Sequence, residues 1–199
     1  MLKPGDHAPE FTLSAATGEP FRLSAFRGVK NVVIFFYPKD NTPGCTTEGA
    51  NFRDLHDRFA KAGAVVAGIS RDSIKSHQGF AAKMGFPFAL ISDADEKLCQ
   101  AFGVIKMKNM YGKQVRGIER STFVIDAAGV LRREWRGVKV PNHVADVLAS
   151  PKEKIVRAAI APSGWTKGRP GKVDVLIGSP SAINFDGPQI APAITRPWP

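Results

Sequence analysis

The residues best suited to chemistry lie in one short segment, YPKDNTPGCTTE at residues 37–48. Thr42 is a favourable N-cap residue, and Pro43 suits the first position of a helix, where its missing N–H costs nothing. Cys45 then falls in the first turn, where unpaired backbone N–H groups and the helix dipole favour an anion. Thiols at helix N-termini ionise readily, and the thiolate is the nucleophilic form. The segment therefore predicts a reactive cysteine.

Cys45 also has a simpler interpretation as a small buried residue, which is common for free cysteine. Its neighbours, Gly44 and two threonines, make a poor apolar setting and favour the reactive interpretation. Gly44 would also let a small substrate approach closely, because it carries no side chain.

The elements that must position this segment begin with buried strands. Residues 31–37 (NVVIFFY) and 64–70 (AVVAGIS) are continuous apolar runs, as expected of central strands, and residues 88–91 form a shorter one. Apolar residues also flank turn signals at residues 17–18 and 128–129, which predicts two hairpins. The reactive segment follows the first central strand, and open α/β sheets place their sites at this carboxyl end.

Helices are predicted between these strands. Phe52, Leu55 and Phe59 recur at helical spacing after the reactive segment. Further helices are expected over residues 74–84 with Ser73 as N-cap, over residues 95–102, and over residues 141–148 with Pro141 in the first turn. Alternating strands and helices with hairpins at both ends predict an α/β domain with a mixed sheet.

Composition separates residues 151–199 from the rest of the chain. Proline and glycine make up about a quarter of that segment, which is typical of low-complexity sequence. We therefore place a compact domain at residues 3–150 and an irregular, largely disordered tail at residues 151–199. Residues 173–177 of the tail could form one short strand.

The whole chain has 199 residues and a formal net charge of +10 at pH 7. Its hydrophobic content of 43% and charged content of 23% exclude a wholly disordered, collagen-like or coiled-coil chain. No apolar run approaches the ~20 residues of a membrane helix, and the N-terminus lacks a secretory signal. We therefore expect a cytoplasmic protein without a membrane partner. Two cysteines are too few for a disulfide scaffold.

The order of the motifs resembles that of the peroxiredoxins. The spacing Pro38-x-x-x-Thr42-x-x-Cys45 is similar to the family signature, and FFYPKDNTPGCTTEGANFRD resembles the bacterioferritin comigratory protein (PrxQ) subfamily. GDHAPEFTL near the start, ISRDS after the second buried strand and GIERSTFVID extend the resemblance over about residues 3–150. It implies a thioredoxin-like fold, with a central mixed sheet flanked by helices. It also implies reduction of hydrogen peroxide and organic hydroperoxides to water and alcohols, without a metal or organic cofactor.

The resemblance also implies which residues form the site. Cys45 matches the peroxidatic cysteine, which attacks the peroxide O–O bond and becomes a sulfenic acid. Thr42 matches the threonine that hydrogen-bonds the thiolate and the peroxide. Pro38 matches the proline that shields the pocket from water, and Arg120 matches the arginine that faces the thiolate from a neighbouring strand.

Two further residues are candidates for contacts with the substrate. Gly44 lies beside Cys45, and Glu48 follows it by about one helical turn. Glu48 either pairs with Arg120 or simply gains from the helix dipole. The histidines show no metal-ligand spacing, so we expect no metal, and surface or capping roles for all four: His7, His56, His77 and His143.

The recycling step departs from the subfamily pattern. Many members carry a resolving cysteine five residues after the peroxidatic one, where this sequence has Ala50. The other cysteine, Cys99, is either a buried structural thiol or the resolving partner of Cys45. A disulfide requires Cα atoms within about 7 Å of each other. If Cys99 is inert, an external thiol such as thioredoxin, glutaredoxin or glutathione must reduce the sulfenic acid.

We expect a monomer or weak dimer. Two other classes of protein stay open as alternatives. A redox sensor would oxidise at Cys45 but pass the signal to a partner. A nucleic-acid binder would use the basic tail, where Lys167, Arg169 and Lys172 lie near Trp165. That signal is weak, and we expect no specific nucleic acid. The lack of a Cys-x-x-Cys motif disfavours a thioredoxin-type oxidoreductase.

Overall fold

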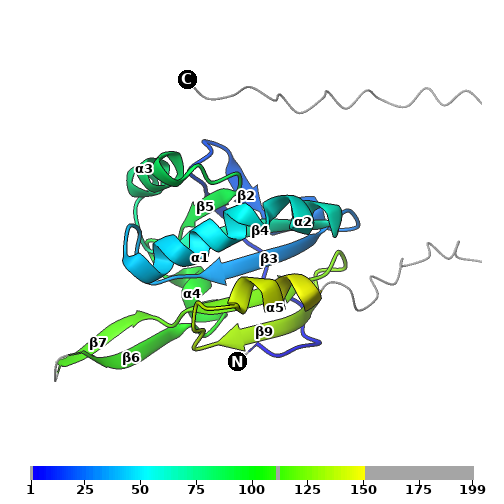
Figure 1. Cartoon of the computed structure of the whole chain (residues 1–199). Coiled ribbons are helices and arrows are strands. Elements are labelled where there is room, and N and C mark those ends of the chain that lie inside the picture. The colour runs from blue at the N-terminus through cyan, green and yellow to red at the C-terminus, as the bar shows by residue number, and fades with distance from the viewer. Residues whose placement is uncertain (1, 111–112, 151–199) are drawn as a thin grey trace, which may run out of the picture. The chain divides into compact units, whose positions relative to one another are not determined.

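The computed structural model describes residues 2–110 and 113–150 of the chain. Its centre is a five-stranded sheet in the order β5-β4-β3-β8-β9 (Figure 1). The strands are β3 (Asn31–Phe36), β4 (Ala64–Ser70), β5 (Ala89–Ser92), β8 (Ser121–Ile125) and β9 (Leu131–Arg136). β3, β4 and β5 run parallel to one another. β8 pairs antiparallel with β3, and β9 pairs antiparallel with β8. The predicted α/β domain with a mixed sheet is confirmed.

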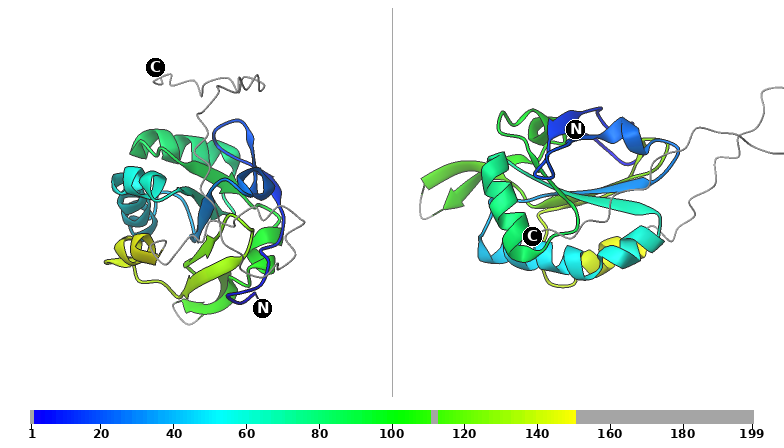
Figure 2. Two further views of the ribbon diagram at one scale, coloured as in Figure 1. Left: turned by 90° about the vertical axis from the view of Figure 1, so that its right-hand side faces the viewer. Right: turned by 90° about the horizontal axis from the view of Figure 1, so that it is seen from above.

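Helices cover both faces of this sheet (Figure 2). On one face lie α1 (Pro43–Asp54), α2 (His56–Lys61), α3 (Ile74–Met84) and α5 (His143–Ala149). On the other face, α4 (Lys97–Ala101) packs with the N-terminal segment. That segment holds the predicted hairpin, β1 (Thr12–Ser14) with β2 (Pro20–Arg22), and the 3-10 helix η1 (Leu23–Phe26).

The alternation of side chains along β3 divides the core into two clusters. Val32, Ile34 and Phe36 belong to the cluster under α4 and the N-terminal segment, whereas Val33 and Phe35 belong to the cluster under α1, α2, α3 and α5. Successive residues of a strand point to opposite faces, and every residue of β3 is buried. The continuous apolar run in the sequence is the consequence of covering both faces.

The predicted helices are present with shifted ends. α3 begins after Ser73, whose side chain accepts a hydrogen bond from a backbone N–H of the first turn, as predicted. The helix after the reactive segment divides at Leu55 into α1 and α2. α5 starts at His143, behind Asn142 with a φ of 63°. Because the chain turns through this left-handed residue before the helix begins, the prediction of Pro141 in the first turn is wrong.

One hairpin was not predicted. β6 (Ile105–Met110) and β7 (Lys113–Ile118) pair antiparallel as a separate two-stranded sheet beside the central one (Figure 1). β7 leads directly into β8, so this hairpin precedes one of the central strands.

Several predictions concern the tail and lie outside the described residues. They are the irregular, largely disordered tail over residues 151–199, the short strand over residues 173–177 and the basic group around Trp165. Within residues 2–110 and 113–150, no helix is long and apolar enough to cross a membrane.

Candidate active site

The predicted reactive segment joins the end of β3 to α1. α1 begins at Pro43 with Thr42 as its N-cap, so Cys45 is the third residue of the helix and lies in its first turn, as predicted. The Tyr37 N–H donates to the Ile69 carbonyl at 3.0 Å, which keeps the chain beside β4 for one residue beyond β3. The Cys45 thiol is free and only 2% exposed. The fold therefore presents one sulfur at a helix N-terminus, shielded from bulk water.

Arg120 reaches this sulfur from the position directly before β8, the strand that pairs with β3. In the register of β3 and β8, Phe36 lies opposite Ser121, so Arg120 stands level with the start of the reactive segment. Its Nη2 donates to Cys45 Sγ at 3.2 Å, and its Nη1 donates to Glu48 Oε2. Strand pairing thus brings a guanidinium to a thiol that lies 75 residues away in the sequence.

One guanidinium faces two acids at this site. Glu48 is completely buried, and its Oε1 has no hydrogen-bond partner among the described residues. Burial raises the pKa of Glu48 to about 7, against the opposing attraction of Arg120. Burial also works against the charge on Arg120, yet Glu48 and Cys45 hold the pKa of the guanidinium above its ordinary value. Since arginine stays charged at any physiological pH, a permanent cation faces the thiol.

The remaining candidates lie in the loop and first turn beside the thiol. A Cβ on Gly44 would stand 3.3 Å from Arg120 Nη2, so the missing side chain leaves room for the guanidinium. The Thr42 hydroxyl donates to the Lys39 carbonyl at 3.1 Å and makes no capping hydrogen bond to the helix. Pro38 is half-buried. The roles of Thr42 and Pro38 toward thiolate, peroxide and water stay predictions.

Two histidines are buried, so the surface roles predicted for them are wrong. His77 is completely buried, with Nδ1 2.9 Å from Asp40 Oδ2 and Nε2 3.2 Å from the Ile91 carbonyl oxygen. His143 Nε2 lies 2.8 Å from Thr122 Oγ1, and burial lowers the pKa of His143 to about 4. Partners far away in the sequence satisfy both rings, and spacing along the chain cannot reveal such partners.

Asp40 was not among the predicted site residues, although it lies in the reactive segment itself. Its carboxylate is buried and accepts a hydrogen bond from the Tyr37 hydroxyl at 2.8 Å. An acidic residue four positions after the end of a buried strand and five before a candidate nucleophile was the available signal. Charged side chains are seldom buried without a partner, so an acid at this position predicts a hydrogen-bonding partner for its carboxylate.

The second cysteine lies on the opposite face of the sheet. Cys99, in α4, belongs to the core cluster under the N-terminal segment, whereas Cys45 belongs to the cluster under α1. Cys99 is completely buried, and its N–H donates to Asp93 Oδ2 at 2.6 Å. Burial and the neighbouring Asp93 raise the pKa of the Cys99 thiol well above its ordinary range. The central sheet separates the two thiols, which favours the interpretation of Cys99 as a structural residue.

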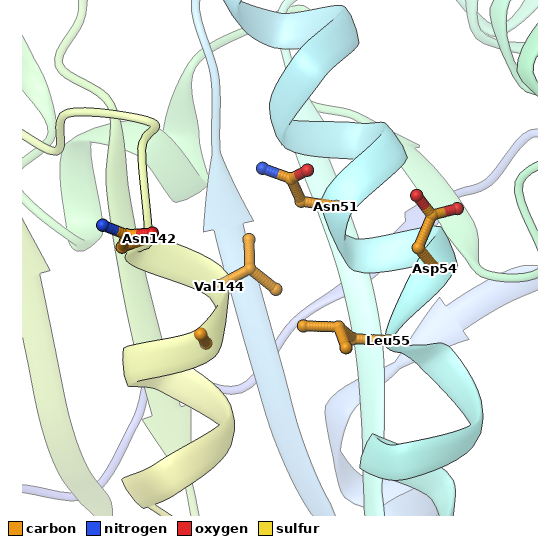
Figure 3. Close-up of a pocket in the computed structure, with 6 residues that line it drawn as sticks. Asn51, Asp54, Leu55, Asn142 and Val144 are labelled. Carbon is orange, nitrogen blue, oxygen red and sulfur yellow. The ribbon is translucent and has the colours of Figure 1, made fainter.

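A groove of about 220 Å³ lies between α1 and α5 (Figure 3), and Cys45 is not among its lining residues. Its lining comes from the C-terminal half of α1, the residue after it and the start of α5: Asn51, Asp54, Leu55, Asn142, Val144 and Ala145. None of these was a predicted site residue. The groups able to react gather instead at the other end of α1, around Cys45.

Comparison with known proteins identifies close relatives. The model of the AhpC/TSA family matches residues 4–134. Peroxiredoxin Bcp of Xanthomonas campestris is 56% identical over 143 residues, which cover 72% of this chain and 89% of that protein. Peroxiredoxin Bcp of Bacillus subtilis is 49% identical over 149 residues, which cover 75% of this chain and 94% of that protein.

Solved structures show the same similarity. A structure of the Xanthomonas campestris bacterioferritin comigratory protein, from work on its alkyl peroxide reduction, is 56% identical with a TM-score of 0.68, covering 71% of this chain and 90% of that chain. A mutant of Xylella fastidiosa PrxQ is 45% identical with a TM-score of 0.71, covering 75% and 94%. The family match spans the residues that meet at the site, Cys45, Glu48 and Arg120.

Proposed function

The chain belongs to the AhpC/TSA family, within the Bcp/PrxQ subfamily of peroxiredoxins, and we propose that this thiol-dependent peroxidase reacts with peroxide through Cys45 alone. The observation that carries the proposal is the 3.2 Å contact of Arg120 Nη2 with Cys45 Sγ at the N-terminus of α1. A helix N-terminus and a guanidinium both stabilise negative charge, and here they converge on one sulfur. The substrate is a hydroperoxide and the reductant is a thiol.

The reaction starts from the Cys45 thiolate. Its sulfur attacks one peroxide oxygen, so that an S–O bond forms while the O–O bond breaks. The departing oxygen takes the bonding electron pair and then a proton, and leaves as water or an alcohol. Cys45 is left as a sulfenic acid. Negative charge thus moves from sulfur to oxygen, and donors fixed along that path stabilise the transition state more than the ground state. Arg120 and the N–H groups of the first turn supply such donors.

Four neighbours of the thiol support this reaction. The Thr42 hydroxyl turns from its present carbonyl partner toward the peroxide, and Pro38 excludes water. Gly44 leaves space for the guanidinium and the substrate. Glu48 binds Nη1 of Arg120, which leaves Nη2 directed at the sulfur.

Recycling requires a thiol from outside the chain. Ala50 occupies the usual resolving position, and Cys99 lies beyond the sheet. An external thiol attacks the sulfenic sulfur and displaces water, and a second thiol then reduces the mixed disulfide. Thioredoxin or another thiol of the cytoplasm suits this role, since a reducing compartment keeps thiols free.

The proposal is tested by mass spectrometry of the reduced full chain after one equivalent of hydrogen peroxide. Dimedone is present to trap sulfenic acid, and no thiol is added. We expect one adduct on the Cys45 peptide in the parent and in Cys99→Ala, and none in Cys45→Ser. Loss of two hydrogens from a monomer, with Cys99 in a disulfide, would overturn the single-cysteine cycle. An unchanged parent would overturn the assignment of Cys45.

A further inference from the structure

A buried polar cluster fixes the segment that delivers Cys45 to α1. Asp40 lies between β3 and α1 and is 5% exposed. Its Oδ1 accepts a hydrogen bond from the Tyr37 hydroxyl at 2.8 Å, and its Oδ2 accepts one from Ser76 Oγ at 2.7 Å. His77 Nδ1 lies 2.9 Å from the same Oδ2. We call these four residues, Tyr37, Asp40, Ser76 and His77, the Asp40 cluster.

Asp40 and His77 are hydrogen-bond partners within the Asp40 cluster. The Nε2 of His77 lies 3.2 Å from the Ile91 carbonyl oxygen, so acceptors face both ring nitrogens and both are placed to donate. Burial works against the carboxylate, yet hydrogen bonds from His77 and Ser76 hold the pKa of Asp40 below its ordinary value. Removing either partner would leave a buried polar group unpaired, which is costly.

The Asp40 cluster ties the active-site loop to elements that do not react. Ser76 and His77 lie in the first turn of α3, and Ile91 lies in β5. The backbone N–H of Asp40 donates to Asp72 Oδ2 at 2.9 Å, in the loop after β4. The loop is therefore held at one residue by both its side chain and its backbone.

A displacement of Asp40 would reach the sulfur through a short, stiff stretch of chain. Asn41 has a φ of 57°, in the left-handed region that most residues avoid. Thr42 occupies the N-cap position of α1, and Pro43 has a fixed φ at the first helical position. Because these residues have little freedom, they pass a movement on to Cys45 rather than absorb it.

Cys45 is 2% exposed, so a thiol reductant reaches its sulfenic acid only after the start of α1 has moved. We infer that Asp40 and His77 form a positioning pair that holds the start of α1 while Cys45 reacts with peroxide, and that opening of this pair admits the reductant. The inference rests on the proposed role of Cys45. The strength of the buried Asp40–His77 contact then sets the balance between reaction with peroxide and access of the reductant.

The test compares Asp40→Asn, His77→Gln and the double variant in the full chain. One measurement is the second-order rate constant of the reduced protein with hydrogen peroxide. The other is the rate of Cys45 alkylation by N-ethylmaleimide, followed by peptide mass spectrometry. We expect the rate with peroxide to fall by about tenfold to a hundredfold, because displacing a reacting group by about 1 Å has effects of that order. The rate of alkylation should rise about tenfold. Because the pair acts as a unit, both rates of the double variant should equal those of the single variant with the larger change.

Asp93→Asn is the matched control. Asp93 is also completely buried, and its carboxylate accepts the N–H groups of Leu98 and Cys99 at the start of α4. This variant should lose stability while both rates at Cys45 stay unchanged. If the Asp40 cluster were merely structural, its variants would behave in the same way, and that result would overturn the inference. So would two rates that fall together.

Hydrogen exchange on the parent protein covers the case in which Asp40→Asn or His77→Gln fails to fold. The amides of Thr46 and His77 donate to the carbonyls of Thr42 and Ser73 at the starts of α1 and α3, and they are expected to exchange through one shared opening with the same free energy. Independent openings would overturn the inference. Failure of the proposed function shows differently, since Cys45→Ser would then still consume peroxide while exchange continued to report on the pair.

Discussion

Replacing Glu48 with glutamine should stabilise the protein in a pH-dependent way. Glutamine keeps the shape of the carboxyl group and cannot ionise, so it stands in for protonated Glu48. Burial raises the pKa of Glu48 from 4.5 to about 7. Between these values the folded chain keeps a proton that the unfolded chain has released. The stability of the parent therefore falls as the pH rises through this window.

The size of the effect follows from the same two pKa values of Glu48. A difference of one pKa unit corresponds to about 1.4 kcal/mol, so full ionisation of the buried carboxyl lowers the free energy of unfolding by roughly 3 kcal/mol. The attraction of Arg120 is already contained in the raised value. Glu48→Gln should match the parent near pH 4.5 and should exceed it by up to about 3 kcal/mol above pH 7.

Urea unfolding of the reduced full chain across this pH range measures the difference directly. Glu19→Gln, at an exposed position in the N-terminal hairpin turn, is the control and should show no comparable trend. The reasoning would be refuted if the free energy of unfolding of Glu48→Gln exceeded that of the parent by the same amount at both ends of the pH range. It would also be refuted if the stability of the parent increased relative to that of the variant as the pH rises.

The other substitutions test single contacts. Arg120→Met should slow the reaction of Cys45 with hydrogen peroxide by about a hundredfold to a thousandfold, the usual effect of losing one transition-state donor. Stopped-flow kinetics would show this, and an unchanged rate would remove Arg120 from the site. Gly49→Ala should lower the free energy of unfolding by about 1–3 kcal/mol, because its Cβ would stand 2.5 Å from Phe86 Cζ. Gly79→Ala, in α3, meets nothing within 4 Å and should instead gain about 1 kcal/mol in the same urea titration.

Local signals were sufficient to place the thiol. The N-cap and proline before Cys45 act within one helical turn, and the apolar run of β3 reflects burial of each residue in turn. Such signals depend only on neighbours in the chain, so the start of α1 and the carboxyl end of β3 could be predicted without any knowledge of the fold.

Contacts between distant segments could not be predicted in this way. Only the family resemblance pointed to Arg120, because its approach to Cys45 depends on the register that sets Phe36 opposite Ser121. The same limit applies to His77, whose partner lies 37 residues away and makes its burial tolerable. Nothing in the spacing of these residues records the pairing.

The hairpin of β6 and β7 was missed for a different reason. Ile105 and Ile118 at its base pack in or against the core, but Met107 is 60% exposed and Val115 is 43% exposed, so the hairpin beyond its base buries little apolar surface. Strands are most readily recognised from the apolar pattern that burial imposes, and a two-stranded sheet that pairs only with itself imposes a weak one.

The two cysteines occupy the same helical position beside opposite charges. Cys45 and Cys99 are each the third residue of a helix, and both are almost completely buried. The charge beside Cys45 is the cation of Arg120. Beside Cys99 it is Asp93, whose carboxylate already accepts N–H groups of the first turn and opposes a second anion there. Burial, the larger effect, and this carboxylate both raise the pKa of the Cys99 thiol. The N-terminus of α1 has a cation beside its thiol instead, and this contrast supports the proposed assignment of Cys45 as the nucleophile.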